Sequence, residues 1–174
     1  MIAYDFAPAT SKSLDELQTE VFVLPFFSDE RPLSGAAGLV DWRLCGALSR
    51  KVMAGYLEGH FGEKAFVAAP PKLKSEALLL FGLGPSTAFD PVVAEKASAA
   101  IAEALADAQV STAAIALPGR SMDLLPALQA MQLWLATSPG EALEEVTIVE
   151  RPEEHRALES LVDGLRRQAE SPLD

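Results

Sequence analysis

The sequence contains little cysteine, histidine or positive charge, and each shortage excludes a class of function. Its single cysteine, Cys45, excludes an internal disulfide and a metal site built from several cysteines. The two histidines, His60 and His155, lie far apart in the sequence and form no local metal-binding motif. Fourteen Lys and Arg residues against 25 Asp and Glu residues give a net charge of −11, and the longest basic runs are the pairs Arg50-Lys51 and Arg166-Arg167. Because phosphate groups bind through Lys and Arg, this balance disfavours nucleic acids and anionic membranes as partners.

Long hydrophobic runs are missing as well. No apolar stretch approaches the ~18 residues that a membrane-spanning helix needs. The first five residues contain no basic region followed by an apolar stretch, so a secretory signal is not expected. With 174 residues, 49% of them hydrophobic, the chain can bury the core of one domain. We therefore expect a single acidic, cytoplasmic domain over residues 1–174.

Several short apolar runs predict a β-sheet. Four runs are continuous rather than alternating in polarity, which is typical of strands covered on both faces; they span residues 21–27, 65–69, 77–81 and 112–117. A fifth run, 146–149, alternates better and is expected toward an edge of the sheet. The connection 70–76 is too short for a helical crossover, so the strands it joins should be antiparallel and the sheet mixed.

Amphipathic segments separate these strands and predict helices. Val40, Leu44, Leu48 and Val52 recur at every fourth position, which favours one helix within residues 34–58 with Ser34 as its cap. Further helices are expected over 91–108, with Asp90 as its cap, over 124–137, and from Pro152 onward. Strands that alternate with helices predict an α/β fold, here a three-layer α/β/α sandwich with a mixed sheet.

The order of elements from Val21 to Gly119 is more informative than any single motif. An apolar strand is followed by the helical segment Leu33–Gly62, and then by a strand ending in Gly82-Leu83-Gly84. An Ala-rich helix and a strand ending near Pro118 complete this order. In this order and spacing the chain resembles the N-terminal domain of the leucyl aminopeptidase family, whose members are hexameric metallo-aminopeptidases.

The resemblance implies a macro-domain-like fold and an accessory role. In the family the metal ligands lie in a separate C-terminal peptidase domain, within a motif that reads roughly Asn-Thr-Asp-Ala-Glu-Gly-Arg-Leu and has no counterpart here. We therefore expect no catalytic residue, no metal and no cofactor. The leading hypothesis is a non-catalytic interaction, assembly or regulatory module. Its partner would be a second copy of the chain, most simply in a dimer, or a separately encoded peptidase. Aminopeptidase-related activity is a less favoured alternative.

A small-molecule site is the second hypothesis. Two loops follow predicted strands, where ligands of open α/β sheets bind, and they contain Gly82, Gly84, Ser86, Thr87, Gly119 and Arg120. In macro domains, loops at such places cradle the diphosphate of ADP-ribose, so the resemblance implies a nucleotide or ADP-ribose-like ligand. However, the full Gly-x-Gly-x-x-Gly pattern is missing, and the glycines also fit ordinary turns.

The remaining candidates favour structural roles. Cys45 is expected within a helix as a small core residue, whereas Trp42 should fall outside the main apolar stripe. The acidic stretches 141–145 and 150–154, and the segment Asp29-Glu30-Arg31, are expected at the solvated surface.

The segment around Met131 is apolar over most of its helical circumference. Such a helix is either deeply buried or covered by a partner. Leu128, Met131 and Trp134 are accordingly the candidate residues for a homo-oligomer interface, with burial in the core as the alternative for Trp134.

Overall fold

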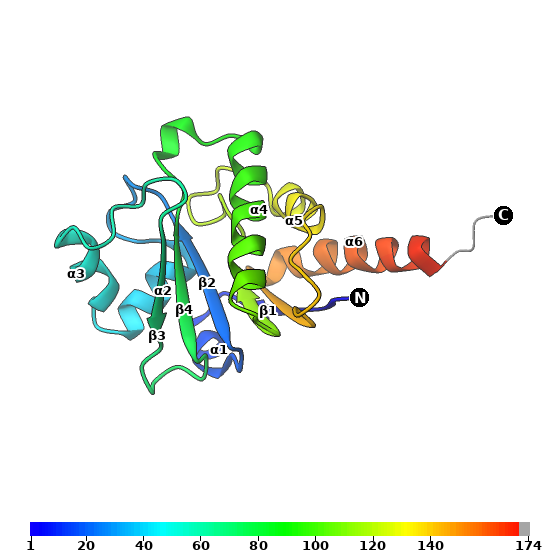
Figure 1. Ribbon diagram of the computed structural model, residues 1–174, viewed down its shortest axis with the longest axis horizontal. Helices are drawn as coiled ribbons and strands as arrows, with labels where there is room; N and C mark the ends of the chain where they lie inside the picture. Colours follow the sequence, from blue (N-terminus) through cyan, green and yellow to red (C-terminus); the bar gives the residue numbers. More distant parts are fainter. Residues whose placement is uncertain (171–174) are drawn as a thin grey trace.

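A computed structural model describes residues 1–170 and contains one six-stranded sheet with helices on both faces (Figure 1). The strands are β1 (Ala3–Pro8), β2 (Val21–Phe26), β3 (Lys64–Ala68), β4 (Ala77–Gly82), β5 (Thr112–Ile115) and β6 (Glu145–Glu150). The α-helices are α1 (Ser11–Glu16), α2 (Gly35–Arg43), α3 (Ala47–Met53), α4 (Pro91–Asp107), α5 (Ala127–Leu135) and α6 (Pro152–Glu170). A short 3-10 helix, η1 (Ser86–Ala88), precedes α4.

The sheet has the order β1-β6-β5-β2-β4-β3 and is mixed, as predicted. All neighbouring strands are parallel except β3 and β4, which pair antiparallel across the short 70–76 connection. Successive residues of β2 point into two different cores: Val21 and Val23 pack toward α4 and α5, whereas Phe22 and Leu24 pack toward α2 and α3. Burial on both faces explains why this strand is a continuous apolar run.

One strand prediction needs correction, and one strand was not predicted. β6 is not at an edge, because β1 pairs with it in parallel and takes the edge position. The sequence did not predict β1, in which Tyr4 and Phe6 alternate with the exposed Ala3 and Asp5, a pattern that is short and weakly apolar. The half-buried, alternating pattern expected of an edge strand therefore belongs to β1.

The helix expected within 34–58 is broken in two. Cys45 and Gly46 adopt positive φ angles of 55° and 78°, which end α2 and turn the chain before α3. The carboxylate of Asp41 accepts hydrogen bonds from the backbone N–H groups of Leu48 (2.8 Å) and Ser49 (3.0 Å), and so caps the start of α3. Cys45 is exposed, so its expected place as a core residue in mid-helix is wrong.

The other helices lie close to their predicted ranges. Asp90 caps α4 by accepting from Val93 N–H at 2.8 Å, and Pro91 occupies the first position. Helix α6 begins at Pro152, packs through Leu158 and Val162, and extends away from the body of the molecule (Figure 1). Ser34 precedes α2, but its side chain makes no capping hydrogen bond.

The apolar segment of α5 belongs to the core. Met131 is fully buried and Trp134 is 1% exposed, both packed against α4 and the sheet. The interface role expected of these two residues is corrected accordingly, because neither offers surface to a partner. Leu128 is 41% exposed, and its interface role stays a prediction.

Candidate functional site

A cavity of about 220 Å³ lies at the carboxyl ends of the parallel strands β2, β5 and β6. Its lining includes the first turn of α2, the loop after β5 and the end of β6; the residues are Ala9, Pro25, Gly35, Ala36, Ala37, Ala116, Leu117, Arg120, Ser121, Asp123, Val149, Glu150 and Arg151. Open α/β sheets bind ligands at this edge. This cavity, called the cleft below, is therefore the candidate small-molecule site.

A buried ion pair forms the inner wall of the cleft. Arg120 Nε donates to Glu150 Oε2 at 2.7 Å and Arg120 Nη2 donates to Oε1 at 3.1 Å, while Nη1 donates to the carbonyl of Leu125 at 2.7 Å. The two side chains are 9% and 5% exposed. Burial alone would lower the pKa of the Arg120 guanidinium, but the hydrogen bond and charge of Glu150, with Asp123 and Glu154, raise that pKa above its ordinary value. The guanidinium is thus charged and fully engaged by protein groups.

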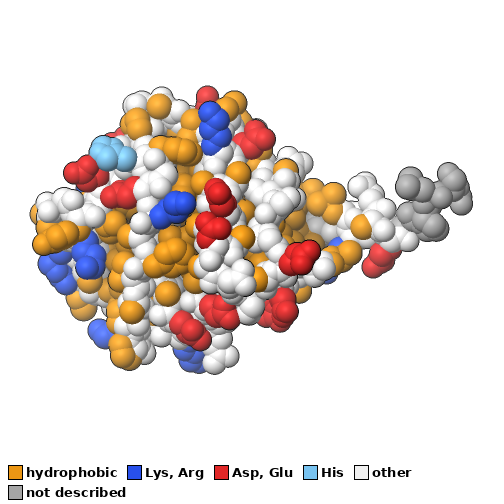
Figure 2. All heavy atoms as spheres, viewed as in Figure 1, with side chains coloured by type: hydrophobic (Ala, Val, Ile, Leu, Met, Phe, Trp, Pro, Cys, Tyr) orange, Lys and Arg blue, Asp and Glu red, His pale blue; other side chains and the backbone are white. Residues whose placement is uncertain are grey.

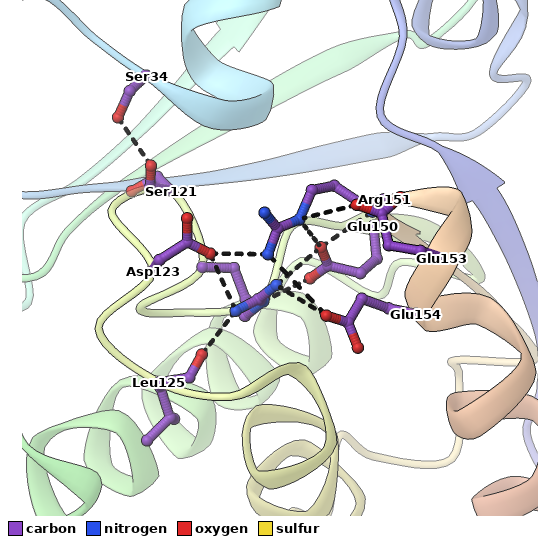
Figure 3. Close-up of polar contacts among 9 residues, drawn as sticks. Ser34, Ser121, Asp123, Leu125, Glu150, Arg151, Glu153 and Glu154 are labelled. Carbon is purple, nitrogen blue, oxygen red and sulfur yellow. Dashed lines mark hydrogen bonds and ion pairs between the residues drawn. The ribbon is translucent and has the colours of Figure 1, made fainter.

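The second arginine of the cleft, Arg151, also pairs with carboxylates, but its side chain is 46% exposed. Arg151 Nη2 donates to Asp123 Oδ1 at 2.8 Å, and its guanidinium lies within 4 Å of Glu150, Glu153 and Glu154 (Figure 3). Two arginines therefore face four carboxylates, which leaves a surplus of negative charge around the cleft. A diphosphate would have to displace these carboxylates before either arginine could bind it.

The two loops that flank the cleft are tied to each other. The Ser34 hydroxyl lies 2.6 Å from Glu30 Oε1 and 3.0 Å from the carbonyl oxygen of Ser121, and the Ser121 hydroxyl donates to Glu30 Oε2 at 3.2 Å. Gly35 packs so closely that a Cβ there would lie 2.9 Å from Ser121 Cα. Glu30, expected at the surface, is almost fully buried because it also accepts from the N–H groups of Phe27 and Ser34.

The loop after β4 offers few free donors. A Cβ on Gly82 would lie 2.1 Å from the carbonyl oxygen of His60, so this glycine allows a close backbone approach. Ser86 donates both its N–H, at 2.8 Å, and its hydroxyl to the carboxylate of Asp29, and these hydrogen bonds lower the pKa of Asp29. The donors of Ser86, which a phosphate ligand would need, are therefore already bound to one of the protein's own carboxylates.

The two predicted ligand loops are separated in space. β2 lies between β4 and β5 in the sheet, and the ring of Phe89 packs against Gly119 and, edge-on at 5.0 Å between ring centroids, against Phe27. Of the six predicted ligand-binding residues, Arg120 lines the cleft; Gly82, Gly84, Ser86, Thr87 and Gly119 lie outside its lining. A ligand role for them stays a prediction.

Among the charged residues of the cleft, the sequence did not single out Asp123, Glu150 and Arg151. Glu150 was expected at the solvated surface with the rest of 150–154. Its place directly after an apolar strand was the available signal, because it puts Glu150 at the same sheet edge as Arg120. Within residues 1–170, no group of three or more His, Cys, Asp or Glu side chains is placed to hold a metal ion.

The sheet order, the mixed pairing and the two covering layers define a macro-domain-like α/β sandwich. The fold is similar to that of a Trypanosoma brucei macrodomain in complex with ADP, with a TM-score of 0.71 and 15% identity over 92% of this chain and 69% of that one. An Oceanobacillus iheyensis macrodomain with ADP gives a TM-score of 0.66 at 15% identity, over 89% of this chain and 88% of that one. At such identities the similarity shows the fold alone.

Sequence similarity narrows the class. Residues 23–133 match the family model for the N-terminal domain of the cytosol aminopeptidase family, and the chain therefore belongs to that family. A tomato leucine aminopeptidase variant is similar in structure, with a TM-score of 0.59 and 18% identity, over 91% of this chain and 35% of that one. The chain thus spans about a third of the tomato chain. No curated protein sequence matches.

No helix within the described part of the chain is both long and apolar enough to cross a membrane.

Proposed function

We propose that this chain is a non-catalytic interaction module of the cytosol aminopeptidase family, which binds a protein partner in the cytoplasm. The partner is a second copy of the chain or a separately encoded peptidase. One observation carries the proposal: three large side chains of the broken α2–α3 segment are left in solvent. Trp42 is 73%, Met53 82% and Tyr56 79% exposed. Aromatic side chains dominate the binding energy of protein interfaces, so their exposure favours a partner that covers them.

The chemistry of the cleft supports a binding role over a catalytic one. Its arginines are bound to carboxylates at hydrogen-bond distances, and its flanking loops are joined through Glu30. A catalytic acid or base needs a group that is free to exchange a proton with a substrate. The family model covers the N-terminal domain, which is distinct from the peptidase domain in which the metal ligands are expected.

The experiment is light scattering together with a hydrolysis assay on the purified chain. We expect a mass above 18.5 kDa at high concentration, or a complex with a peptidase domain of the same family, and no hydrolysis of a leucine anilide with Mn²⁺ or Zn²⁺ present. A monomer that binds no peptidase, or hydrolysis that a chelator abolishes and a mock purification lacks, would refute the proposal.

A second candidate function is the binding of a small anion. The first turn of α2 lines the cleft without a side-chain cap, and the N-terminus of a helix attracts anions. A volume of about 220 Å³ is below the range of ~300–1,000 Å³ of typical ligand pockets, which suits a ligand smaller than a nucleotide. A thermal-shift panel of ADP-ribose, ADP, phosphate and small carboxylates tests this candidate, because a ligand that binds only the native state raises the melting temperature.

A further inference from the structure

Positive charge is concentrated in one part of this acidic chain. Residues 32–74, which form α2, α3, β3 and their connections, hold six basic residues (Arg43, Arg50, Lys51, Lys64, Lys72 and Lys74) and three acidic ones (Asp41, Glu58 and Glu63), a net charge of +3. The rest of the chain holds eight basic and 22 acidic residues, a net charge of −14. Figure 2 shows Lys and Arg side chains beside hydrophobic ones at the left of the view, where Figure 1 places α3.

Most of these cations lack a carboxylate partner. In the described chain, Arg50, Lys51, Lys64 and Lys72 form no ion pair within 4 Å, whereas Arg43 pairs with Asp15 at 2.7 Å and Lys74 pairs with Glu16 at 3.2 Å. In a chain with a surplus of acidic residues, unpaired cations are not explained by a shortage of carboxylates. Their charge remains available to a partner.

A hollow of about 580 Å³ lies among the same elements. It is lined by Pro32, Leu33, Gly38, Asp41, Trp42, Arg43, Cys45, Gly46 and Lys72, and is called the α2–α3 hollow below. Trp42 supplies a largely exposed apolar wall, Lys72 an unpaired ammonium group, and Arg50 Nη1 donates to the carbonyl of Cys45 at 2.7 Å beside the hollow. The carboxylate of Asp41 accepts from Ser49 Oγ and from two N–H groups of α3, so its charge is already compensated.

We propose that the α2–α3 hollow docks an acidic protein segment that carries an apolar anchor side chain. The anchor lies against Trp42, and carboxylates on either side of it pair with Lys72 and Arg50. The proposal deepens the proposed function, on which it rests, by assigning the docking surface and the chemistry of the partner.

The geometry favours a protein segment over a membrane or a nucleic acid. A concave hollow beside an exposed Trp can accept a protruding side chain, whereas a lipid surface offers no such protrusion. A nucleic acid would bring a continuous row of phosphates toward a molecule whose remaining surface is strongly acidic. A short acidic segment can contact the α2–α3 hollow alone.

The test uses the full chain and a synthetic peptide with a central leucine flanked on each side by three glutamates. Trp42 is exposed and Trp134 is buried, so a blue shift in tryptophan emission reports contact at Trp42. Fluorescence anisotropy of a dye-labelled peptide gives the affinity independently of tryptophan emission. We expect Trp42→Ala to weaken binding about tenfold or more and Lys72→Glu to weaken it about fivefold. Raising the salt concentration from about 50 mM to about 500 mM should weaken binding several-fold.

Matched variants on the other layer serve as controls. Lys96→Glu on α4 and Leu165→Ala on α6 alter an exposed cation and an exposed apolar residue outside the hollow, and should leave the affinity unchanged. Replacing the leucine of the peptide by glycine, or its glutamates by lysines, should abolish binding.

Four outcomes would overturn the inference. Peptide binding that Trp42→Ala and Lys72→Glu leave intact would place the site elsewhere. Tighter binding of anionic vesicles or of a single-stranded oligonucleotide, lost in the same variants, would assign the face to another class of partner. Self-association lost in these variants, without peptide binding, would make a second copy the occupant. Association with a copy or a peptidase that survives Trp42→Ala and Lys72→Glu would leave the proposed function standing and refute this surface alone.

Discussion

The two helical layers on either side of the sheet differ in the exposure of their tryptophans. Trp134 lies on α5 and is 1% exposed, whereas Trp42 lies on α2 and is 73% exposed. The layer of α4, α5 and α6 is built on helices of 17, 9 and 19 residues, but the other layer divides its main segment into α2 and α3 of 9 and 7 residues. The turn at Cys45 and Gly46 ends α2 directly after Trp42 and Arg43. The layer of α4, α5 and α6 buries its tryptophan in the core, and the other layer leaves its tryptophan in solvent.

The cleft and the α2–α3 hollow also differ in whether their cations are paired within the chain. Arg120, where the cleft meets α6, has its donors taken by Glu150 and the carbonyl of Leu125. Lys72, in the α2–α3 hollow, has no ion-pair partner among residues 1–170. Because its charges are paired within the chain, the cleft has a structural role. Because Lys72 is not paired in the described chain, the hollow is the candidate binding surface.

The largest expected effect is at Trp134. Trp134→Ala removes a fully buried side chain between α5 and the sheet and should lower the free energy of unfolding by about 3–5 kcal/mol. Trp42→Ala removes a side chain that is mostly in water and should change it by less than about 0.5 kcal/mol. Urea unfolding followed by circular dichroism gives both values.

Trp134→Phe is the control, because it retains most of the buried ring and should cost less than Trp134→Ala. Equal losses for Trp42→Ala and Trp134→Ala would abolish the distinction between the two layers.

The next largest effect concerns the ion pair of the cleft. Glu150→Ala leaves the guanidinium of Arg120 buried without its principal partner, and should cost about 3 kcal/mol of unfolding free energy. The double variant Arg120→Met with Glu150→Leu replaces both charges by apolar groups and should recover most of that loss.

Lys72→Glu is the matched change in the α2–α3 hollow and should cost less than about 0.5 kcal/mol. If Glu150→Ala is equally mild, Arg120 has another partner available and the cleft is not held by this pair. Chemical denaturation of the three variants beside the unmodified protein distinguishes these cases.

Much of the sandwich could be predicted because its strands and long helices have simple periodicities. The continuous run of β2, the short connection between β3 and β4, and the Asp90-Pro91 start of α4 each determine local structure. The break after α2 could not be predicted from the spacing of Val40, Leu44, Leu48 and Val52, because the same spacing fits a continuous helix. The backbone turns at Cys45, a residue that rarely adopts a positive φ.

The candidate sites were predicted less well because they depend on contacts between distant segments. Arg120 and Glu150 are 30 positions apart, and Ser121 and Glu30 are 91 positions apart. The α2–α3 hollow has the same origin, since folding brings Lys72 beside Cys45 and Gly46 in its lining. The pattern of residues within one segment carries no information about contacts between side chains that are distant in sequence.

The smallest effect is expected at the opposite, amino edge of the sheet, where the carboxylate of Glu20 is partly exposed and has no arginine partner among the described residues. Ser111 donates to Glu20 through its hydroxyl at 2.7 Å and its N–H at 2.8 Å, and these hydrogen bonds lower the pKa of Glu20 below its ordinary value of 4.5. Because the folded state favours the charged carboxylate, this contact stabilises the protein above pH 4.5 and loses its effect as the pH falls through the lowered pKa.

Ser111→Ala removes the hydroxyl but retains the backbone N–H, and Glu20 is well solvated. The loss at pH 7 should therefore stay below about 1 kcal/mol, and it should shrink as the pH falls through the lowered pKa of Glu20 and its carboxylate becomes protonated. Urea unfolding of both proteins between pH 7 and pH 3 measures the difference, and Glu20→Gln should remove most of its pH dependence. A Ser111→Ala loss that was equally large in the Glu20→Gln background would show that the hydroxyl acts through packing, and not through the charge of Glu20. The amino edge would then depend on buried contacts as the cleft does, and the contrast between the two edges would disappear.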